Sequence, residues 1–109
     1  MWEGFEELTD KDIYDRAISG DKPAVVIFIK PEDPENERWF SLFSRLQRLY
    51  GDKVNFFYMD TSKTTSYQDL GIFVFPTVLY FRDTMELDRH DYFPSEEEVE
   101  RSIRRLLRL

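Results

Sequence analysis

The sequence contains no cysteine, and this absence excludes several kinds of chemistry. Without a thiol the chain can form no disulfide bond, thiolate nucleophile, iron–sulfur cluster or cysteine-ligated zinc site. Histidine is almost as scarce, since His90 is the only one, which leaves little imidazole for acid–base catalysis or metal binding. We therefore expect no cofactor and no bound metal.

Long apolar runs are missing as well. No stretch of about 18 apolar residues occurs, so we expect no membrane-spanning segment. Residues 1–4 do not place a basic region before an apolar stretch, so we expect no secretory signal peptide. These two features favour a cytoplasmic protein that does not use a membrane as a partner.

The composition is typical of one globular domain that covers residues 1–109. Hydrophobic residues make up 41% of the chain and aromatic residues 17%, which is enough apolar material for a core. The net charge of −7 disfavours nucleic acid as a partner, because an acidic surface repels a polyanion. Charged residues reach 34% and arginines outnumber lysines, a composition compatible with a thermophilic source.

Hydrophobic patterning predicts alternating strands and helices. The continuous apolar run at residues 24–29, bounded by Pro23 and Pro31, is typical of a strand buried on both faces. The predicted strands cover residues 5–8, 24–29, 54–60, 77–81 and 86–91. The predicted helices cover residues 10–19, 37–50, 66–70 and 96–107, with apolar positions at helical spacing in the second of them.

Two of these helices begin with the pattern of a capping box, Thr9 with Asp12 and Ser95 with Glu98. The first strands, which are joined by helices, should run parallel, and the last two strands, joined by a short turn, should run antiparallel. The element order is β-α-β-α-β-α-β-β-α, which predicts a mixed sheet with helices on both faces.

Several short motifs lie in register with this order. Residues 70–77 place a glycine–isoleucine pair before Pro76 and Thr77, residues 22–28 lead into the second helix, and Asp60 ends the third strand. Together with residues 8–10 and 50–54, these motifs resemble the thioredoxin family over roughly residues 5–107. The resemblance implies a thioredoxin-like three-layer α/β/α sandwich with a mixed central sheet and a cis Phe75–Pro76 bond.

The departures from that family all concern its redox site. The register of the family's Cys-x-x-Cys motif falls on Asp33, Pro34, Glu35 and Asn36. The resemblance also implies that Glu32 replaces a tryptophan, Ile27 a buried aspartate and Tyr92 a glycine beside the groove. Because a buried carboxylate has only a desolvation cost once no thiol titrates, an apolar Ile27 is physically reasonable. We expect no thiol–disulfide oxidoreductase activity.

Four acidic side chains gather at the start of the second helix: Glu32, Asp33, Glu35 and Glu37. One interpretation is a calcium or magnesium site built from oxygen ligands. The other, which we favour, is the stabilisation of the positive end of a helix dipole by nearby carboxylates. A hydrolytic pair made of Asp33 and Glu35 would need a shaped pocket and pKa values that are pushed apart.

The last helix carries a stripe of arginines, Arg101, Arg104, Arg105 and Arg108. The stripe has the pattern of a docking surface for an acidic partner or a phosphate backbone. A solvated face whose cations suit the end of the helix explains the stripe better, because four glutamates on the same helix balance its charge. We favour the solvated face.

Phe73 and Phe75 belong to the loop that, in the thioredoxin family, borders a peptide-binding groove beside the cis-proline. With Tyr92 nearby they could form an exposed apolar patch for a partner, or they could cap a groove that is no longer used. We expect a redox-inactive module that binds a protein or peptide. The expected partner-binding residues are Asp33, Pro34, Glu35, Asn36, Phe73, Phe75, Pro76 and Tyr92. The alternatives are a homodimer paired through the aromatic patch and an enzyme or metal site built from carboxylates.

Overall fold

The structure, a computed structural model, describes residues 1–108. The elements, in chain order, are β1 (Glu6–Glu7), η1 (Tyr14–Ile18), β2 (Ala24–Ile29), α1 (Glu35–Tyr50), β3 (Asn55–Asp60), α2 (Ser66–Asp69), β4 (Thr77–Arg82), β5 (Met85–His90) and α3 (Glu96–Leu107). The fold is mixed α/β. None of the helices in residues 1–108 has the length and apolar character needed to cross a membrane.

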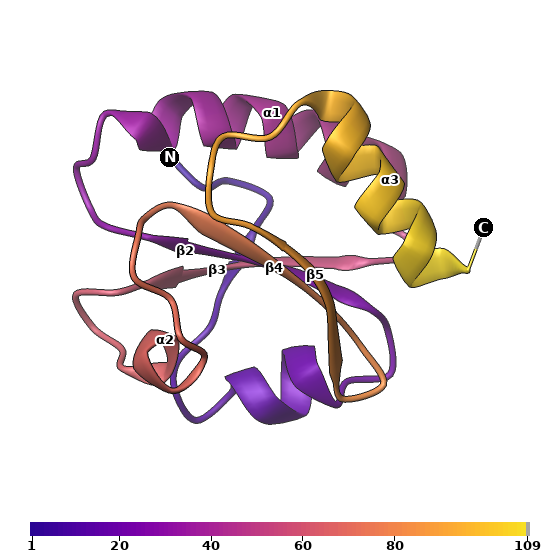
Figure 1. The fold of residues 1–109 in the computed structure, drawn as a ribbon, viewed down its shortest axis with the longest axis horizontal. Coiled ribbons are helices and arrows are strands. Elements are labelled where there is room, and N and C mark those ends of the chain that lie inside the picture. The colour runs from indigo at the N-terminus through magenta and orange to yellow at the C-terminus, as the bar shows by residue number, and fades with distance from the viewer. Residues whose placement is uncertain (109) are drawn as a thin grey trace.

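The strands form one five-stranded sheet in the order β1-β3-β2-β4-β5 (Figure 1). The first three strands are parallel: β3 pairs with β1 on one side and with β2 on the other. β4 is antiparallel to both β2 and β5. The predicted parallel pairing of the early strands and antiparallel pairing of the last two are both confirmed.

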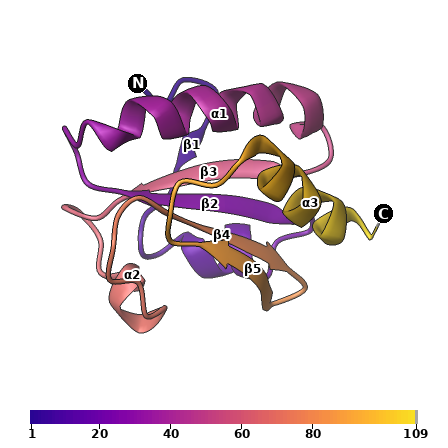
Figure 2. The same cartoon turned by 45° about the horizontal axis from the view of Figure 1, so that its top comes forward.

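Helices cover both faces of the sheet (Figure 2). β2 supplies side chains to both faces in alternation, and all six of its residues are buried, as its continuous apolar run predicted. Val25, Ile27 and Ile29 face the core under α1 and α3. Ala24, Val26 and Phe28 face the core on the side of η1 and α2. The alternation follows from the period of two along a strand.

The helix predicted at residues 10–19 is wrong in extent, because the regular segment η1 covers only Tyr14–Ile18 and is π-helical. The predicted capping box is absent as well. The Thr9 hydroxyl donates to the Asp12 carboxylate at 3.0 Å and does not accept from a backbone amide at the start of η1, where no side chain caps. Gly20 does follow the segment's end, where an added Cβ would lie 2.6 Å from the Arg16 carbonyl oxygen.

The capping box of α3 is confirmed. The Glu98 amide donates to Ser95 Oγ at 3.1 Å, and the Ser95 amide donates to Glu98 Oε1 at 3.0 Å. These bonds satisfy two amides that a helix start otherwise leaves unpaired. Val99, Ile103 and Leu106 of α3 then pack into the same core as α1.

Candidate functional site

Three loops meet at one end of the strands. β2 and β3 are parallel and end there, whereas β4 begins there and β5 ends there, because β4 is antiparallel to both of its neighbours. We call the resulting surface the loop edge and define it by residues 30–34, 71–76 and 91–94. It lies on the left of the molecule in Figure 1. Segments that are distant in the sequence thus converge at this edge.

The loop edge carries apolar side chains that the core does not cover. Phe73 is 87% exposed, Tyr92 51% and Val74 49%. The Thr77 hydroxyl donates to the Val74 carbonyl at 2.7 Å, which ties the backbone of this loop to the start of β4. Phe73 and Tyr92 were predicted as site residues, whereas Val74 was not. Val74 lies inside an apolar run, and the sequence alone does not indicate which members of such a run reach solvent.

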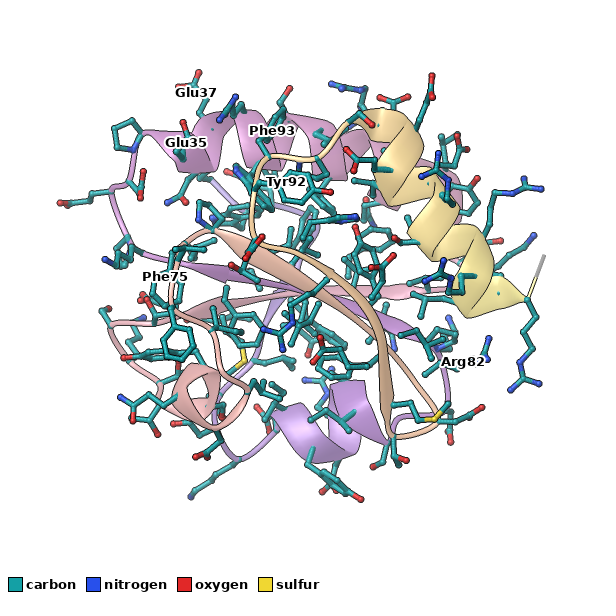
Figure 3. The ribbon with its side chains drawn as sticks, in the orientation of Figure 1. Glu35, Glu37, Phe75, Arg82, Tyr92 and Phe93 are labelled. Carbon is teal, nitrogen blue, oxygen red and sulfur yellow. The ribbon has the colours of Figure 1, made fainter. Side chains whose placement is uncertain are left out.

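Phe75 is half-buried and is supported from two sides. Its ring packs edge-to-face against Tyr67 of α2 with 5.3 Å between ring centroids. The Lys30 ammonium lies 5.4 Å from the centroid of the Phe75 ring. Figure 3 shows Phe75 at the loop edge. The Phe75–Pro76 bond is cis, as predicted, and Pro76 itself is buried.

Tyr92 is held on the start of α3. Its hydroxyl donates to Glu98 Oε2 at 2.6 Å, and this hydrogen bond raises the pKa of the Tyr92 phenol. The amide of Ser95, followed by the Tyr92 hydroxyl, lowers the pKa of Glu98 by stabilising its carboxylate. The next residue, Phe93, faces α1. The guanidinium of Arg38, on that helix, lies over the Phe93 ring at 4.2 Å from the ring centroid.

The residues in the register of the Cys-x-x-Cys motif have structural partners. Asp33 Oδ1 accepts from the Glu35 amide at 2.9 Å, and the Glu35 carboxylate accepts from Arg38 at 2.9 Å. Asn36 is only 3% exposed because it lies on the inward face of α1, and its Nδ2 donates to the Lys30 carbonyl at 2.8 Å. Of this segment, Pro34 is exposed. Asn36 and Pro76, both expected to contact a partner, are thus buried.

The acidic side chains at residues 32–37 are not part of any three-ligand metal site among the described residues. No group of three histidine, aspartate or glutamate side chains within residues 1–108 is arranged to hold a metal ion. Glu32 and Glu37 instead line a cavity of about 430 Å³ beside the start of α1. Glu32 has a left-handed backbone with φ 64°.

The arginine stripe on α3 is partly engaged within the molecule. Arg105 donates to the Leu87 carbonyl at 3.3 Å, and Arg108 donates to Asp83 Oδ2 at 2.7 Å. Arg82 reaches from β4 and donates to the Arg105 carbonyl at 2.9 Å, near the end of α3. At least two of the four arginines, Arg105 and Arg108, therefore hold the end of α3 against β5 and the turn that precedes it.

No family model matches this sequence, and no curated protein matches it. The residues of the loop edge are therefore the ones that indicate a function. That edge combines exposed apolar side chains with carboxylates and one lysine, which are groups suited to holding another chain.

Proposed function

We propose that this chain is a redox-inactive member of the thioredoxin-like group that binds a protein or peptide at the loop edge. The mixed sheet covered by helices on both faces is compatible with the fold that the motif resemblance implies. The chain has no thiol with which to exchange disulfides. The scaffold would then serve as a binding surface without redox chemistry.

The exposure of Phe73 is the observation that carries this proposal. At 87% exposure the ring has almost no contact with its own chain. Full burial of such a side chain contributes about 1.5–3 kcal/mol. Val74 lies directly beside it and is 49% exposed. Adjacent exposed apolar side chains on a loop tied to the sheet are the kind of anchor on which protein interfaces depend.

Charge around the loop edge favours a partner that carries basic as well as apolar side chains. Two of its three loops each carry an exposed acidic side chain, Glu32 in one and Asp91 in the other. The chain as a whole has a net charge of −7. Complementary charge speeds association and rejects acidic competitors. We therefore propose a basic peptide segment with an apolar residue that packs against Phe73.

A peptide-display selection against the protein, followed by fluorescence anisotropy with the selected peptide, tests the proposal. Phe73→Asp should weaken binding by at least about tenfold, because it removes an apolar contact and adds a charge. Leu49→Asp is the matched control: Leu49 is 64% exposed on α1, away from the loop edge, and undergoes the same chemical change. This control should bind as the wild type does.

Three results would contradict the proposal. Equal affinity of the Phe73→Asp variant and the wild type would place the peptide elsewhere. Selection of peptides without basic residues would remove the charge argument. If sedimentation shows a wild-type dimer that Phe73→Asp dissociates, the surface serves self-association, and the peptide proposal is replaced by the homodimer.

A further inference from the structure

A β-bulge in β5 brings the side chains of Glu86 and Arg89 to the same face of the sheet. In a regular strand, residues three positions apart point to opposite faces. The register of β5 on β4 shifts between Tyr80 and Phe81, and Leu87 is left as an extra residue. Glu86 pairs with Phe81 and so lies on the face of the core beside η1 and α2. Bulges re-aim side chains in this way.

Arg89 joins β5 to the end of α2. Its Nε and Nη2 donate to the two carboxylate oxygens of Glu86 at 2.6 and 2.8 Å, and this bidentate pair fixes the plane of the guanidinium. The same guanidinium donates to the Leu70 carbonyl at 2.8 Å and to the Gly71 carbonyl at 3.3 Å. Arg89 therefore connects the sheet to the first residue of the loop at residues 71–76.

The way in which α2 ends leaves these two carbonyls free for Arg89. Gly71 has a φ of 70°, its amide donates to the Gln68 carbonyl at 3.1 Å, and the Ile72 amide donates to the Tyr67 carbonyl at 3.0 Å. These bonds form the Schellman pattern that ends a helix. A Cβ added at Gly71 would meet no atom of a distant residue within 4 Å. Hydrogen bonds, including those from Arg89, therefore hold this turn in place of packing.

The other end of the loop is fixed as well. The Thr77 hydroxyl donates to the Val74 carbonyl at 2.7 Å, and Pro76 is buried. Ile72, directly after the turn, is only 3% exposed. Between these fixed points the side chains of Phe73 and Val74 project into solvent. The loop thus displays two apolar side chains from a backbone that is held at both ends.

We propose that Arg89 is a positioning residue of the loop edge, which holds the loop at residues 71–76 in its binding conformation before a peptide arrives. The inference rests on the proposed function for the role of the loop in binding. The rigidity of the loop does not depend on that function and can be measured in the free protein.

Positioning and direct contact have different kinetic effects. If only a fraction of the molecules has the binding conformation, the apparent Kd rises by the inverse of that fraction. The loss then lies in the association rate, because a bound peptide still makes the same contacts and leaves at the same rate. Removal of a contact, as in Phe73→Asp, acts mainly on the dissociation rate.

Relaxation of ¹⁵N nuclei tests the rigidity of the loop without a peptide. In the wild type, the amide order parameters at Phe73 and Val74 should equal those of rigid backbone, about 0.85, and Arg89→Met should lower them below about 0.6. Arg105→Met is the matched control. It removes the same charge and a bond to the Leu87 carbonyl of β5, outside the loop, and should leave both order parameters unchanged.

Stopped-flow anisotropy with the selected peptide tests the effect on binding. Arg89→Met should lower the association rate at least about threefold and change the dissociation rate by less than about twofold. Arg105→Met corrects for the altered steering of a basic peptide, because its charge change is the same. Arg89→Lys keeps the charge but lacks the planar fork, so it should also slow association. This second variant serves if Arg89→Met does not fold.

Several results would overturn the inference. One is a wild-type order parameter below about 0.6 at Phe73 or Val74, and another is a loop that stays rigid in both Arg89 variants. A faster dissociation with unchanged association would make Arg89 a contact residue. If Phe73→Asp binds as the wild type does while the loop still loosens without Arg89, the proposed function fails and the role of Arg89 in holding the loop stands.

Discussion

The carboxylate of Asp10 fixes the element that supports Phe75. It accepts hydrogen bonds from the Thr65 amide at 2.9 Å, the Ser66 amide at 2.9 Å and the Ser66 hydroxyl at 2.5 Å. These donors belong to the start of α2, whose own residue Tyr67 packs on the Phe75 ring. Asp10, more than fifty residues away in the sequence, thus acts as the N-terminal cap of α2. Asp10→Asn should loosen α2 and, through Tyr67, the loop edge.

The size of the effect follows from the capping role. Complete loss of a capping side chain costs about 0.5–2 kcal/mol. Asparagine keeps one of the two acceptor oxygens but loses the charge and the second oxygen, which accept from the Thr65 and Ser66 donors, so we expect about 1 kcal/mol at most. For a domain of this size, that corresponds to a melting temperature lower by about 4–6 °C. Differential scanning calorimetry at pH 7 measures this shift directly. Asp15→Asn, which removes the same charge from an exposed residue of η1, is the control and should change the melting temperature by less than about 2 °C.

The pH dependence supplies a second signature. The Ser66 hydroxyl, with help from the Thr65 and Ser66 amides, lowers the pKa of Asp10 in the folded state. The stabilisation is therefore complete above the pKa of the unfolded chain, about 3.9, and is lost as the pH falls through the lower folded value. The penalty of Asp10→Asn should be constant from pH 6 to 8 and shrink below pH 4. Equal melting temperatures for the two variants, or a penalty that grows in acid, would refute this reasoning.

Three further predictions concern other parts of the chain. Glu32→Gly should stabilise the fold by about 0.5–1 kcal/mol, because Glu32 has a φ of 64° that glycine adopts freely; a loss of stability in urea denaturation would contradict this. Ser95→Ala should cost about 1 kcal/mol through loss of the α3 capping box, and unchanged urea stability would contradict it. Burial lowers the pKa of His90, against the opposing effect of the Asp88, Glu98 and Asp91 carboxylates. The unfolded chain thus gains its proton first, so wild-type stability should fall relative to His90→Asn between pH 7 and 5, and parallel pH profiles would contradict this.

Elements specified by local interactions were predicted well from the sequence. The strand at residues 24–29 was predicted correctly because a short, uninterrupted apolar run between two prolines is typical of a strand buried on both faces. The start of α3 was found because Ser95 and Glu98 bond to each other within one turn. By contrast, the first helix was predicted too long, since Thr9 and Asp12 bond side chain to side chain and Asp10 has its partners in a distant segment.

The candidate site shows the same limit. Phe73 and Tyr92 were selected on the motif register, and both are exposed. The burial of Asn36 depends on where α1 begins, which is Glu35 and not residue 37 as predicted. The cavity was not foreseen, because it forms only when Trp2 folds back against the start of α1 and Tyr58. Such contacts between distant segments have no local signature in the sequence.

Backbone NMR with the selected peptide tests the central proposal most directly. We predict that the amide shifts on peptide addition cluster at Phe73, Val74, Phe75 and Tyr92 and at the neighbouring residues 30–33. These amides belong to three loops that meet only in the folded protein (Figure 3). Shifts that instead follow the exposed face of α3, or that center on η1, would contradict binding at the loop edge.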